Sequence, residues 1–243
     1  RAALFPRWLP NIICTTFAAN ALLDVHEALA EPLCLEAAVS AADFLLESLY
    51  YEEGPLACFS YMPLARSNVH NANLLGAAFL CRVAGSSGQE KYLAPALKAA
   101  RFSLACQYPD GSWDYGKSDN PPQRWKDNFH TGFNLTALRL LARFDPEFEA
   151  PLRRGFEFFL GHFLGADGAP HYFHDRVYPL DIHSAAQSIL TLLALQELDG
   201  ENRGRAQRVL RWSLAHLYSG RGYFYFQKLP LYTNRIAYMR WSQ

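Results

Sequence analysis

The sequence predicts an all-α fold built from repeated helical hairpins, and three observations support this. Four helical segments carry an aromatic residue at the same position, with spacings of 58, 54 and 56 residues. A second helix in each repeat opens with Asn or Asp, and long loops rich in Gly and aromatic residues separate the repeats. Self-similarity at such a period indicates a repeat architecture. The aligned aromatic residues are Phe44, Phe102, Phe156 and Trp212.

One helix of each repeat has the character of an outer helix. The segments at about 89–107, 146–163 and 201–218 carry Glu, Lys and Arg on one face. A polar face opposite an apolar one is typical of a helix that packs on a core and meets solvent on its other side. We therefore expect these helices to form an outer layer.

The other helix of each repeat has the character of an inner helix. The segments 73–83, 135–144 and 184–198 are apolar or small around most of their circumference, as in helices that are buried on all sides. Asn and Asp are preferred N-cap residues, so they predict where these helices begin. Inner and outer helices that alternate at this period describe an α/α toroid or solenoid of hairpins. The expected starts are Asn11, Asn68, Asn128, Asp181 and Asn234.

The loops predict where a functional site lies. Connections from inner to outer helices are a few residues long, whereas those from outer to inner helices have about 15 residues. In an up-down arrangement all the long loops lie at the end where the inner helices begin. Long loops in compact domains are usually functional, so this end is the candidate site. The long loops span 50–66, 108–125, 164–179 and 219–231.

Length and composition favour one domain with a large core. The 243 residues suit a single toroid domain, and 50% of them are hydrophobic and 14% aromatic. The chain starts at Arg1 without Met and stops inside an expected helix, so we expect domain 1–243 to be trimmed at one or both ends. Lys and Arg number 23, as do Asp and Glu, which argues against a nucleic-acid surface.

Other sequence features bear on compartment and cofactors. No apolar run approaches the roughly 18 residues of a membrane span. The five cysteines are odd in number and form no CxxC pair, which predicts reduced thiols in a cytoplasmic protein. The chain has no Gly-rich nucleotide fingerprint and no GxSxG elbow, so we expect no cofactor. The pattern His171 to Asp175 is too weak to predict zinc, and we expect no metal.

Three consecutive inner helices present His in their first turn, namely His70, His130 and His183, with amides and carboxylates close by. Polar groups on otherwise apolar helices must be hydrogen-bonded to one another, to water or to a ligand. Their occurrence at equivalent repeat positions favours a pocket lining that binds a hydroxyl-rich or carboxylated substrate. The expected binding residues are His70, Asn71, Asn73, Asp127, Asn128, Asn134, Asp181, Gln187, Arg235 and Tyr238.

The residue types in this lining suggest roles in proton transfer. His130 or His183 would act as the base, and Tyr178, Tyr223 or Tyr238 as the acid. Amides and Arg235 would hold a carboxylate and stabilise the charge that follows proton removal. In a hydrolytic variant, Asp175 or Asp181 would pair with Asp114 or Asp127. The expected catalytic residues are His130, His183, Tyr178 and Asp175.

The stretch from Arg101 through Gln107 and Gly111 to Trp113 resembles the QW motif of squalene cyclases and prenyltransferase-like relatives among α/α toroids. The resemblance implies that Gln107 and Trp113 tie the end of an outer helix to its loop. It supports the fold and carries no function. The DxDD acid and DDxxD motifs of terpenoid enzymes do not occur in the sequence. Polysaccharide lyases and epimerases share the toroid shape, which implies Asn and His for binding a uronate and Tyr and His for proton transfer.

Together these features predict a carbohydrate-active enzyme that acts on a glycan, with uronic-acid lyase or C5-epimerase chemistry preferred. Two competing hypotheses belong to different functional classes. One is a terpenoid cyclase or prenyltransferase-like protein, and the other is a non-enzymatic scaffold that binds glycans or proteins.

Overall fold

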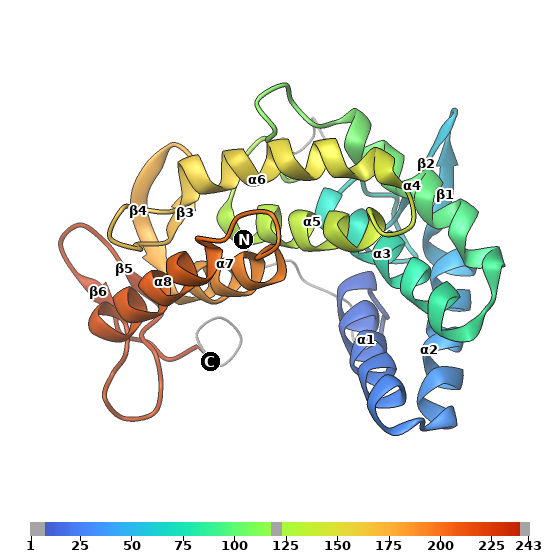
Figure 1. Ribbon diagram of the computed structural model, residues 1–243, viewed down its shortest axis with the longest axis horizontal. Helices are drawn as coiled ribbons and strands as arrows, with labels where there is room; N and C mark the ends of the chain where they lie inside the picture. Colours follow the sequence, from blue (N-terminus) through green and yellow to red (C-terminus); the bar gives the residue numbers. More distant parts are fainter. Residues whose placement is uncertain (1–7, 118–122, 239–243) are drawn as a thin grey trace. The chain divides into compact units, whose positions relative to one another are not determined.

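The computed structural model describes residues 8–117 and 123–238, and it has the helical hairpins that the repeat predicts (Figure 1). The α-helices are α1 (Ile12–Leu29), α2 (Pro32–Phe44), α3 (His70–Ser87), α4 (Leu93–Ala105), α5 (Asn128–Leu141), α6 (Glu149–Phe163), α7 (Ile182–Ala194) and α8 (Asn202–His216). The strands are β1 (Tyr50–Glu53), β2 (Leu56–Phe59), β3 (His171–Phe173), β4 (Arg176–Asp181), β5 (Gln227–Lys228) and β6 (Thr233–Asn234).

The chain divides into two compact units. The first comprises residues 1–106, 116–123 and 140–146, and the second comprises 107–115, 124–139 and 147–243. In the first unit α1 packs on α2 and α3, and α3 packs on α4. In the second unit α7 packs on α8, and α6 packs on β3.

Helix α3 is the buried inner helix of the first unit. Of its 18 residues, 13 are buried, as its apolar and small composition predicts. Asn73 ties this helix to its neighbours, because its Oδ1 accepts from Phe59 N (3.0 Å) and its Nδ2 donates to Ala99 O (2.7 Å). The amide therefore joins α3 to β2 and α4 without leaving a polar group unsatisfied.

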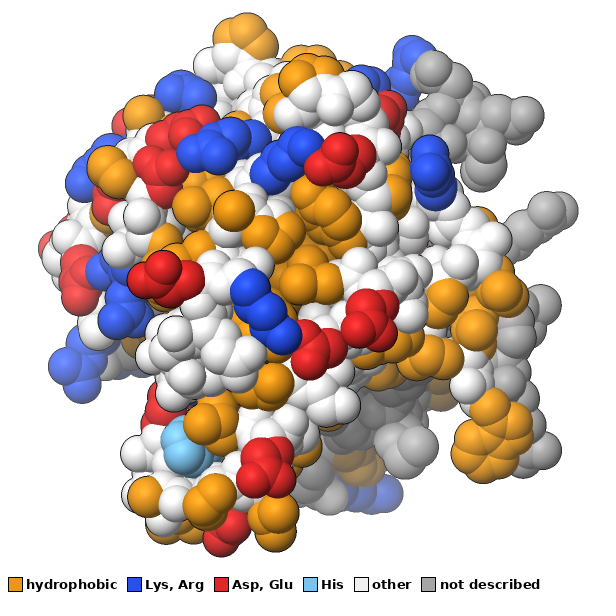
Figure 2. All heavy atoms as spheres, turned by 90° about the vertical axis from the view of Figure 1, so that its right-hand side faces the viewer, with side chains coloured by type: hydrophobic (Ala, Val, Ile, Leu, Met, Phe, Trp, Pro, Cys, Tyr) orange, Lys and Arg blue, Asp and Glu red, His pale blue; other side chains and the backbone are white. Residues whose placement is uncertain are grey.

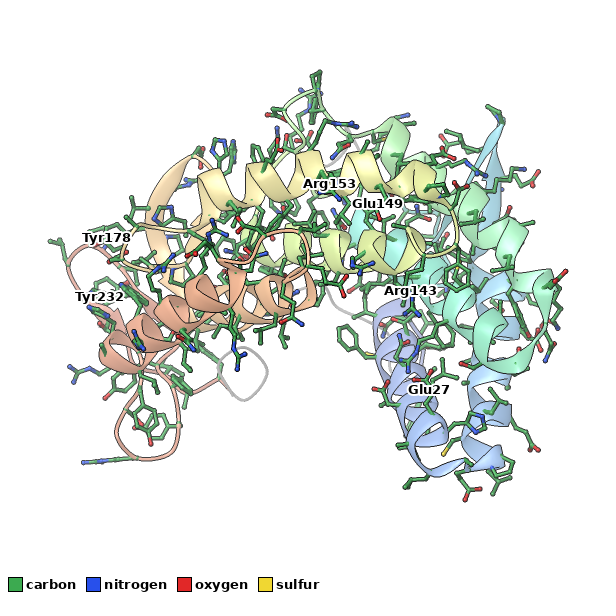
Figure 3. The ribbon with its side chains drawn as sticks, in the orientation of Figure 1. Glu27, Arg143, Glu149, Arg153, Tyr178 and Tyr232 are labelled. Carbon is green, nitrogen blue, oxygen red and sulfur yellow. The ribbon has the colours of Figure 1, made fainter. Side chains whose placement is uncertain are left out.

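The outer helices carry charged faces, as predicted. On α6, Arg153 and Glu149 form an ion pair across one turn at 3.8 Å, and both residues are labelled in Figure 3. Basic and acidic side chains are interspersed on the face of the molecule that Figure 2 presents. This mixing agrees with the equal numbers of positive and negative residues.

The loop after α4 is fixed to α6 by the residues of the QW-like stretch. Gln107 Nε2 donates to Gly111 O (3.0 Å) within the loop and to Pro151 O (2.9 Å) in α6. The ring of Trp113 is 2% exposed and occupies the space that a side chain at Gly155 would need. Gly111 has a φ of +88°, and a Cβ on it would meet the carbonyl of Arg154.

The next repeat contains the same glycine contact. Gly168, in the loop after α6, has a φ of +92°, and a Cβ there would lie 2.6 Å from the backbone of Arg208 in α8. In both repeats the loop backbone rests directly on the following outer helix. Only glycine combines this backbone conformation with so close an approach.

The N-cap predictions have mixed outcomes. Asn11 caps α1 through Cys14 N, and Asp181 caps α7 through Ser184 N, as expected. Helix α3 begins two residues after Asn68, and α5 is capped by Asp127 rather than by Asn128. No helix begins at Asn234 within the described residues, which end at 238 with β6 and a loop, and the expected helix residues 239–243 lie outside that part.

Three of the long loops contain or lead into strands that the repeat pattern does not predict. Strands β1 and β2 form an antiparallel hairpin, with Tyr50 opposite Phe59. Strands β3 to β6 form a four-stranded antiparallel sheet in sequence order. These strands are short, such as the four residues of Tyr50–Glu53, and lack a clear alternation of apolar and polar residues, so the sequence pattern does not reveal them.

Among the described residues, helix α1 is long and apolar enough, by length and composition alone, to cross a membrane. Its 18 residues have a mean hydropathy of 1.2, and it lies near the N-terminus. Core helices and signal sequences pass the same test. In the structure, Asp24 and Glu27 of α1 pair with Arg82 of α3 at 2.5 and 2.9 Å.

Candidate functional site

The candidate site lies in the second unit, where α5 begins. The Asp127 side chain is fully buried, and its Oδ1 accepts from His130 N at 2.9 Å, so that it caps α5. Its Oδ2 lies 2.7 Å from His130 Nδ1. A carboxylate can only accept, so Nδ1 carries the proton and Nε2 is left as the basic nitrogen. The His130 side chain is 21% exposed, which leaves it accessible.

Aromatic residues surround this Asp–His pair. Trp125 Nε1 donates to Asp127 Oδ2 at 3.1 Å, and its ring stacks on Tyr115 at 4.6 Å. Tyr115 in turn packs edge-on against the imidazole of His130 at 4.6 Å. The Asp127 carboxylate thus holds the imidazole and the indole in fixed positions. Trp125 is 40% exposed and so offers an aromatic surface beside His130.

Phe129 joins the pair to a second group of polar residues. Its ring contacts His130 at 4.0 Å, stacks on His183 at 4.4 Å and meets Tyr172 at 5.6 Å. Burial, followed by the charge of His130, lowers the pKa of His183, so this imidazole is neutral at neutral pH. Burial, together with the charges of Asp127 and Asp181, raises the pKa of Tyr172, so its phenol keeps its proton.

Asp181 caps α7 beside these residues. Its carboxylate accepts from Ser184 N at 2.7 Å and is 2% exposed. Burial raises the pKa of Asp181 to about 6, although hydrogen bonds from Ser184 and Gln227 oppose the shift. This carboxyl can therefore change its protonation state near neutral pH.

The structure places other expected residues in the core. In the first unit, His70 is 2% exposed, and its Nδ1 lies 3.1 Å from Ser103 Oγ. Burial lowers the pKa of His70 to about 4, so it is a neutral core residue. Asn73 is fully buried and bonded to backbone. Asn128 is also fully buried, and its Oδ1 accepts from Ser188 Oγ at 3.1 Å. These three side chains are not free to bind a substrate.

Three further amides are buried but differ in their partners. Gln187 Nε2 donates to Thr191 Oγ1 at 3.1 Å within α7. Asn71 Oδ1 and Asn134 Oδ1 are buried without a hydrogen-bond partner. Such orphaned acceptors are rare in folded proteins and are open to water or a ligand.

The remaining expected residues contact groups other than the Asp–His pair. Asp175 is exposed in the turn between β3 and β4 and pairs with Arg176 at 3.2 Å. Tyr178, labelled in Figure 3, lies on β4 and is half-buried. Arg235 is exposed over the ring of Tyr225 at 5.5 Å. Tyr238 is 40% exposed and packs edge-on against Phe226 at 5.1 Å.

Sequence reasoning missed Trp125 and gave Tyr172 and Tyr115 no specific role. A signal was present, because Trp125 precedes the N-cap Asp127 by two residues and Tyr115 occupies the same long loop. The sequence predicts that Asp127 binds substrate, whereas its carboxylate is occupied by protein N–H groups and orients His130.

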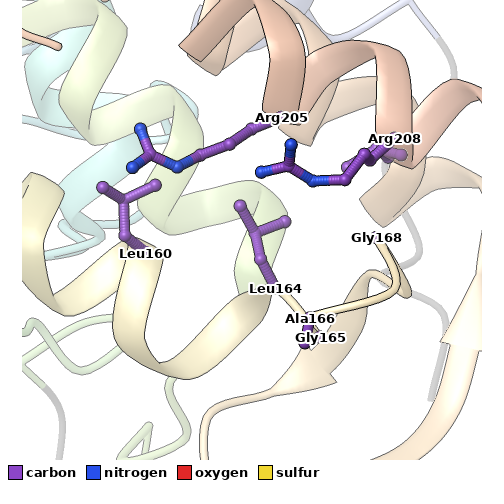
Figure 4. Close-up of a pocket in the computed structure, with 8 residues that line it drawn as sticks. Leu160, Leu164, Gly165, Ala166, Gly168, Arg205 and Arg208 are labelled. Carbon is purple, nitrogen blue, oxygen red and sulfur yellow. The ribbon is translucent and has the colours of Figure 1, made fainter. Parts of the chain in front are cut away.

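Over residues 8–117 and 123–238, no group of three or more His, Cys, Asp or Glu side chains could hold a metal ion. A cavity of about 180 Å³ lies between α6, the following loop and α8, where Arg205 and Arg208 meet Leu160 and Leu164 (Figure 4). A larger cavity of about 430 Å³ lies in the first unit.

Comparisons with known proteins identify the fold. No family model matches the sequence, and the comparison with curated proteins gives no match. An α-mannanase of family GH76 from Bacteroides thetaiotaomicron is 14% identical with a TM-score of 0.70, over 89% of this chain and 63% of that chain. Cellobiose 2-epimerase from Bacillus thermoamylovorans is 11% identical with a TM-score of 0.75, over 93% and 66%.

A third similar structure is the unsaturated glucuronyl hydrolase from Bacillus sp. GL1, which is 13% identical with a TM-score of 0.67, over 86% and 63%. This chain thus spans 63–66% of the length of the three solved structures. All three are α/α-toroid enzymes. The chain therefore has the α/α-toroid fold of repeated helical hairpins that its sequence predicts.

Proposed function

We propose that this protein is a carbohydrate-active enzyme that transfers a proton at a sugar carbon, with His130 as the base. The observation that carries the proposal is the bond of 2.7 Å between His130 Nδ1 and the buried carboxylate of Asp127. This bond fixes the tautomer and leaves Nε2 as a proton acceptor on a side chain that is 21% exposed. A general base needs both this orientation and this access.

The neighbouring groups supply the rest of the chemistry. When His130 takes a proton from a carbon next to a carbonyl or carboxylate, the Asp127 carboxylate stabilises the imidazolium that forms. His183 is neutral because burial lowers its pKa, so it can act as a second base. Tyr172 keeps its proton and can donate a hydrogen bond to the enolate-like oxygen.

The substrate class rests on the fold and on the residues of the site. The similar structures are named for action on mannan, cellobiose and unsaturated glucuronyl groups, which are all carbohydrates. Imidazole, phenol and indole groups beside His130 suit a hydroxyl-rich ring that stacks on an aromatic face. Within this class we prefer a uronic-acid lyase or C5-epimerase, because a carboxylate makes the neighbouring C–H acidic enough for a histidine base.

Hydrolysis is the second candidate, and one observation favours it. The pKa of Asp181 is raised to about 6, which is the property expected of a general acid that protonates a glycosidic oxygen. The other carboxyl, Asp127, is less suited to hydrolysis, because both of its oxygens accept from protein N–H groups. Incorporation of ¹⁸O from labelled water into the product would support hydrolysis over proton transfer.

The test is proton NMR in D₂O with a panel of uronic-acid glycans and reducing disaccharides. We expect loss of the H5 signal of a uronic acid, and unsaturated-sugar peaks if the enzyme is a lyase. Both should vanish in His130→Ala and persist in His26→Ala, a matched change at a partly exposed histidine of α1. No exchange across the panel by the folded protein would contradict the proposed proton transfer.

The same experiment separates carbohydrate chemistry from the terpenoid and scaffold hypotheses. A terpenoid enzyme would leave all sugar signals unchanged and would convert an isoprenoid substrate instead. A non-enzymatic scaffold would leave all sugar signals unchanged and would convert no isoprenoid substrate either. All five cysteines are free thiols, which supports the cytoplasmic location that forms part of this proposal.

A further inference from the structure

We propose that the first unit holds a second binding site, for a sugar that carries one anionic group, in its cavity of about 430 Å³. The inference that the ligand carries an anionic group rests on the lining of the cavity. The inference that the ligand is a sugar rests on the proposed function. Small-molecule sites have volumes of roughly 300–1,000 Å³, so the cavity is large enough for one sugar unit. Its lining is Tyr51, Glu53, Arg66, Ser67, Asn68, Lys117 and Gln123.

Two cations of the lining are available to a ligand. The Arg66 guanidinium lies over the Tyr51 ring at 5.0 Å, and Lys117 Nζ lies 5.7 Å from the centre of the Phe102 ring. In the part of the chain that the structure describes, neither cation forms an ion pair. Arg82 of the same unit, by contrast, pairs with two carboxylates of α1. Unpaired cations beside a cavity are suited to bind a carboxylate or a phosphate.

The acceptors of the cavity are already oriented. The Tyr51 hydroxyl donates to Asn68 Oδ1, and Asn68 Nδ2 donates to Glu53 Oε2 at 3.2 Å. This chain of hydrogen bonds fixes the Glu53 carboxylate by one oxygen and leaves the other to accept from a ligand hydroxyl. Gln123 Oε1 is buried and has no partner, which a sugar hydroxyl would supply.

The backbone keeps the lining residues together. Lys117 N donates to Asn68 O at 2.9 Å, and Val69 forms a β-bridge with Gly116. The space where a side chain at residue 116 would lie is filled by the Gln123 amide. Segments 66–69 and 116–117 are therefore joined by backbone contacts beside strand β1. These contacts hold the lining residues on both segments next to one another.

The balance of charge indicates the ligand class. Arg66 and Lys117 together with Glu53 leave one net positive charge, which matches a ligand with one negative group. Glu53 would repel a ligand that has only anionic surface, whereas it can accept from hydroxyls next to the anionic group. A uronate or a sugar phosphate combines both features.

The experiment is calorimetric titration of the whole protein with D-glucuronate, glucose 6-phosphate, glucose and inorganic phosphate. We expect glucuronate or glucose 6-phosphate to bind at least tenfold more tightly than glucose and than inorganic phosphate. Whichever of these two probes binds more tightly identifies the preferred anionic group as a carboxylate or a phosphate. Equal affinities for all four probes, or no binding, would overturn the proposal.

Variants locate the site and separate it from the proposed active site. Arg66→Ala and Lys117→Ala should each weaken binding of the anionic sugar at least tenfold, whereas Arg203→Ala on exposed α8 should leave it unchanged. Gln123→Leu should weaken binding of the anionic sugar but should not change binding of inorganic phosphate. Binding should survive in His130→Ala, so a failure of proton transfer and a failure of this site are distinguishable. Loss in His130→Ala with no effect of Arg66→Ala would assign the ligand to the second unit instead.

Discussion

His70 in the first unit and His130 in the second occupy equivalent places in the sequence repeat but have different environments. His70 is 2% exposed and bonded to Ser103 in the core, whereas the His130 side chain is 21% exposed and bonded to a buried carboxylate. The first is held neutral by burial, which lowers its pKa to about 4. The second has a free Nε2 beside aromatic residues. Equivalent positions in a repeat therefore do not imply equivalent roles.

The starting residue of each helix explains the difference. His70 is the first residue of α3, which follows Val69, whereas His130 is the third residue of α5, which Asp127 caps. His183 is the second residue of α7. Each residue rotates the side-chain direction by about 100° around the helix, so the three imidazoles point differently relative to their own helices. Asp127 lies three residues before His130, whereas Ser67 lies three residues before His70.

The largest expected effect comes from removing the carboxylate that orients His130. Asp127→Asn keeps a good N-cap but cannot hold the same imidazole tautomer, so the rate of proton exchange should fall about 10³–10⁴-fold. The free energy of unfolding should change by less than about 1 kcal/mol. Exchange rates from NMR and urea unfolding measure the two quantities.

The matched change in the first unit is Ser67→Ala, at the equivalent position before His70. At saturating substrate it should leave exchange unchanged, because Ser67 lines the second binding site and not the Asp–His pair, and its Oγ accepts from Tyr61 N at 2.8 Å. Equal loss of exchange in Ser67→Ala and Asp127→Asn would show that both act through folding, and would remove the argument for an oriented base.

The second expected effect compares two loop glycines with positive φ, one of which is packed against a helix. Gly111→Ala forces a Cβ into the carbonyl of Arg154 at a φ of +88°, whereas Gly220→Ala, at a φ of +75°, meets nothing within 4 Å. Gly111→Ala should therefore lower the free energy of unfolding by about 3 kcal/mol or more, and Gly220→Ala by about 1 kcal/mol. Urea unfolding followed by tryptophan fluorescence measures both. Similar losses would mean that the loop does not rest on α6 in solution.

The repeat and the alternation of inner and outer helices could be predicted from the sequence, because helical period and N-cap chemistry are local. The hairpin β1–β2 and the sheet of β3 to β6 could not, since their pairing depends on contacts between loop residues. The prediction placed His130, His183, Asp127 and Asp181 near one another, and Phe129 connects the two histidines. It could not separate His70 from His130, because a shift of two residues in a helix start is invisible in composition.

The third expected effect concerns the free energy of unfolding, which should depend more on His70 than on His130. His70→Ala removes a buried ring that stacks on Phe102 and bonds to Ser103, so the free energy of unfolding should fall by about 2–3 kcal/mol. His130→Ala should lower it by less than about 1 kcal/mol. Thermal and urea unfolding of both variants would check this. A larger loss in His130→Ala would mean that this residue serves the core, and would weaken its assignment as a base.

The smallest expected effect is the dependence of the free energy of unfolding on pH that arises from Asp181. Its folded pKa of about 6 lies above the ordinary value of 3.8, so the folded protein binds the extra proton between these values. The stability that this proton gives is fully present below about pH 3.8 and is lost as the pH rises through 6.

Asp181→Asn copies the neutral carboxyl and can still cap α7 through Ser184 N, so at pH 7.5 it should raise the free energy of unfolding by about 1–2 kcal/mol. The gain should disappear at pH 4, where the wild-type carboxyl is protonated. Urea unfolding at the two pH values measures it. Asp199→Asn is the control of opposite sign, because hydrogen bonds from Glu201 N and Arg205 lower the pKa of Asp199. If Asp181→Asn were less stable than wild type at pH 7.5 but not at pH 4, the ionised carboxylate of Asp181 would stabilise the folded protein. That result would contradict the raised pKa and would make Asp181 resemble the oriented carboxylate of Asp127.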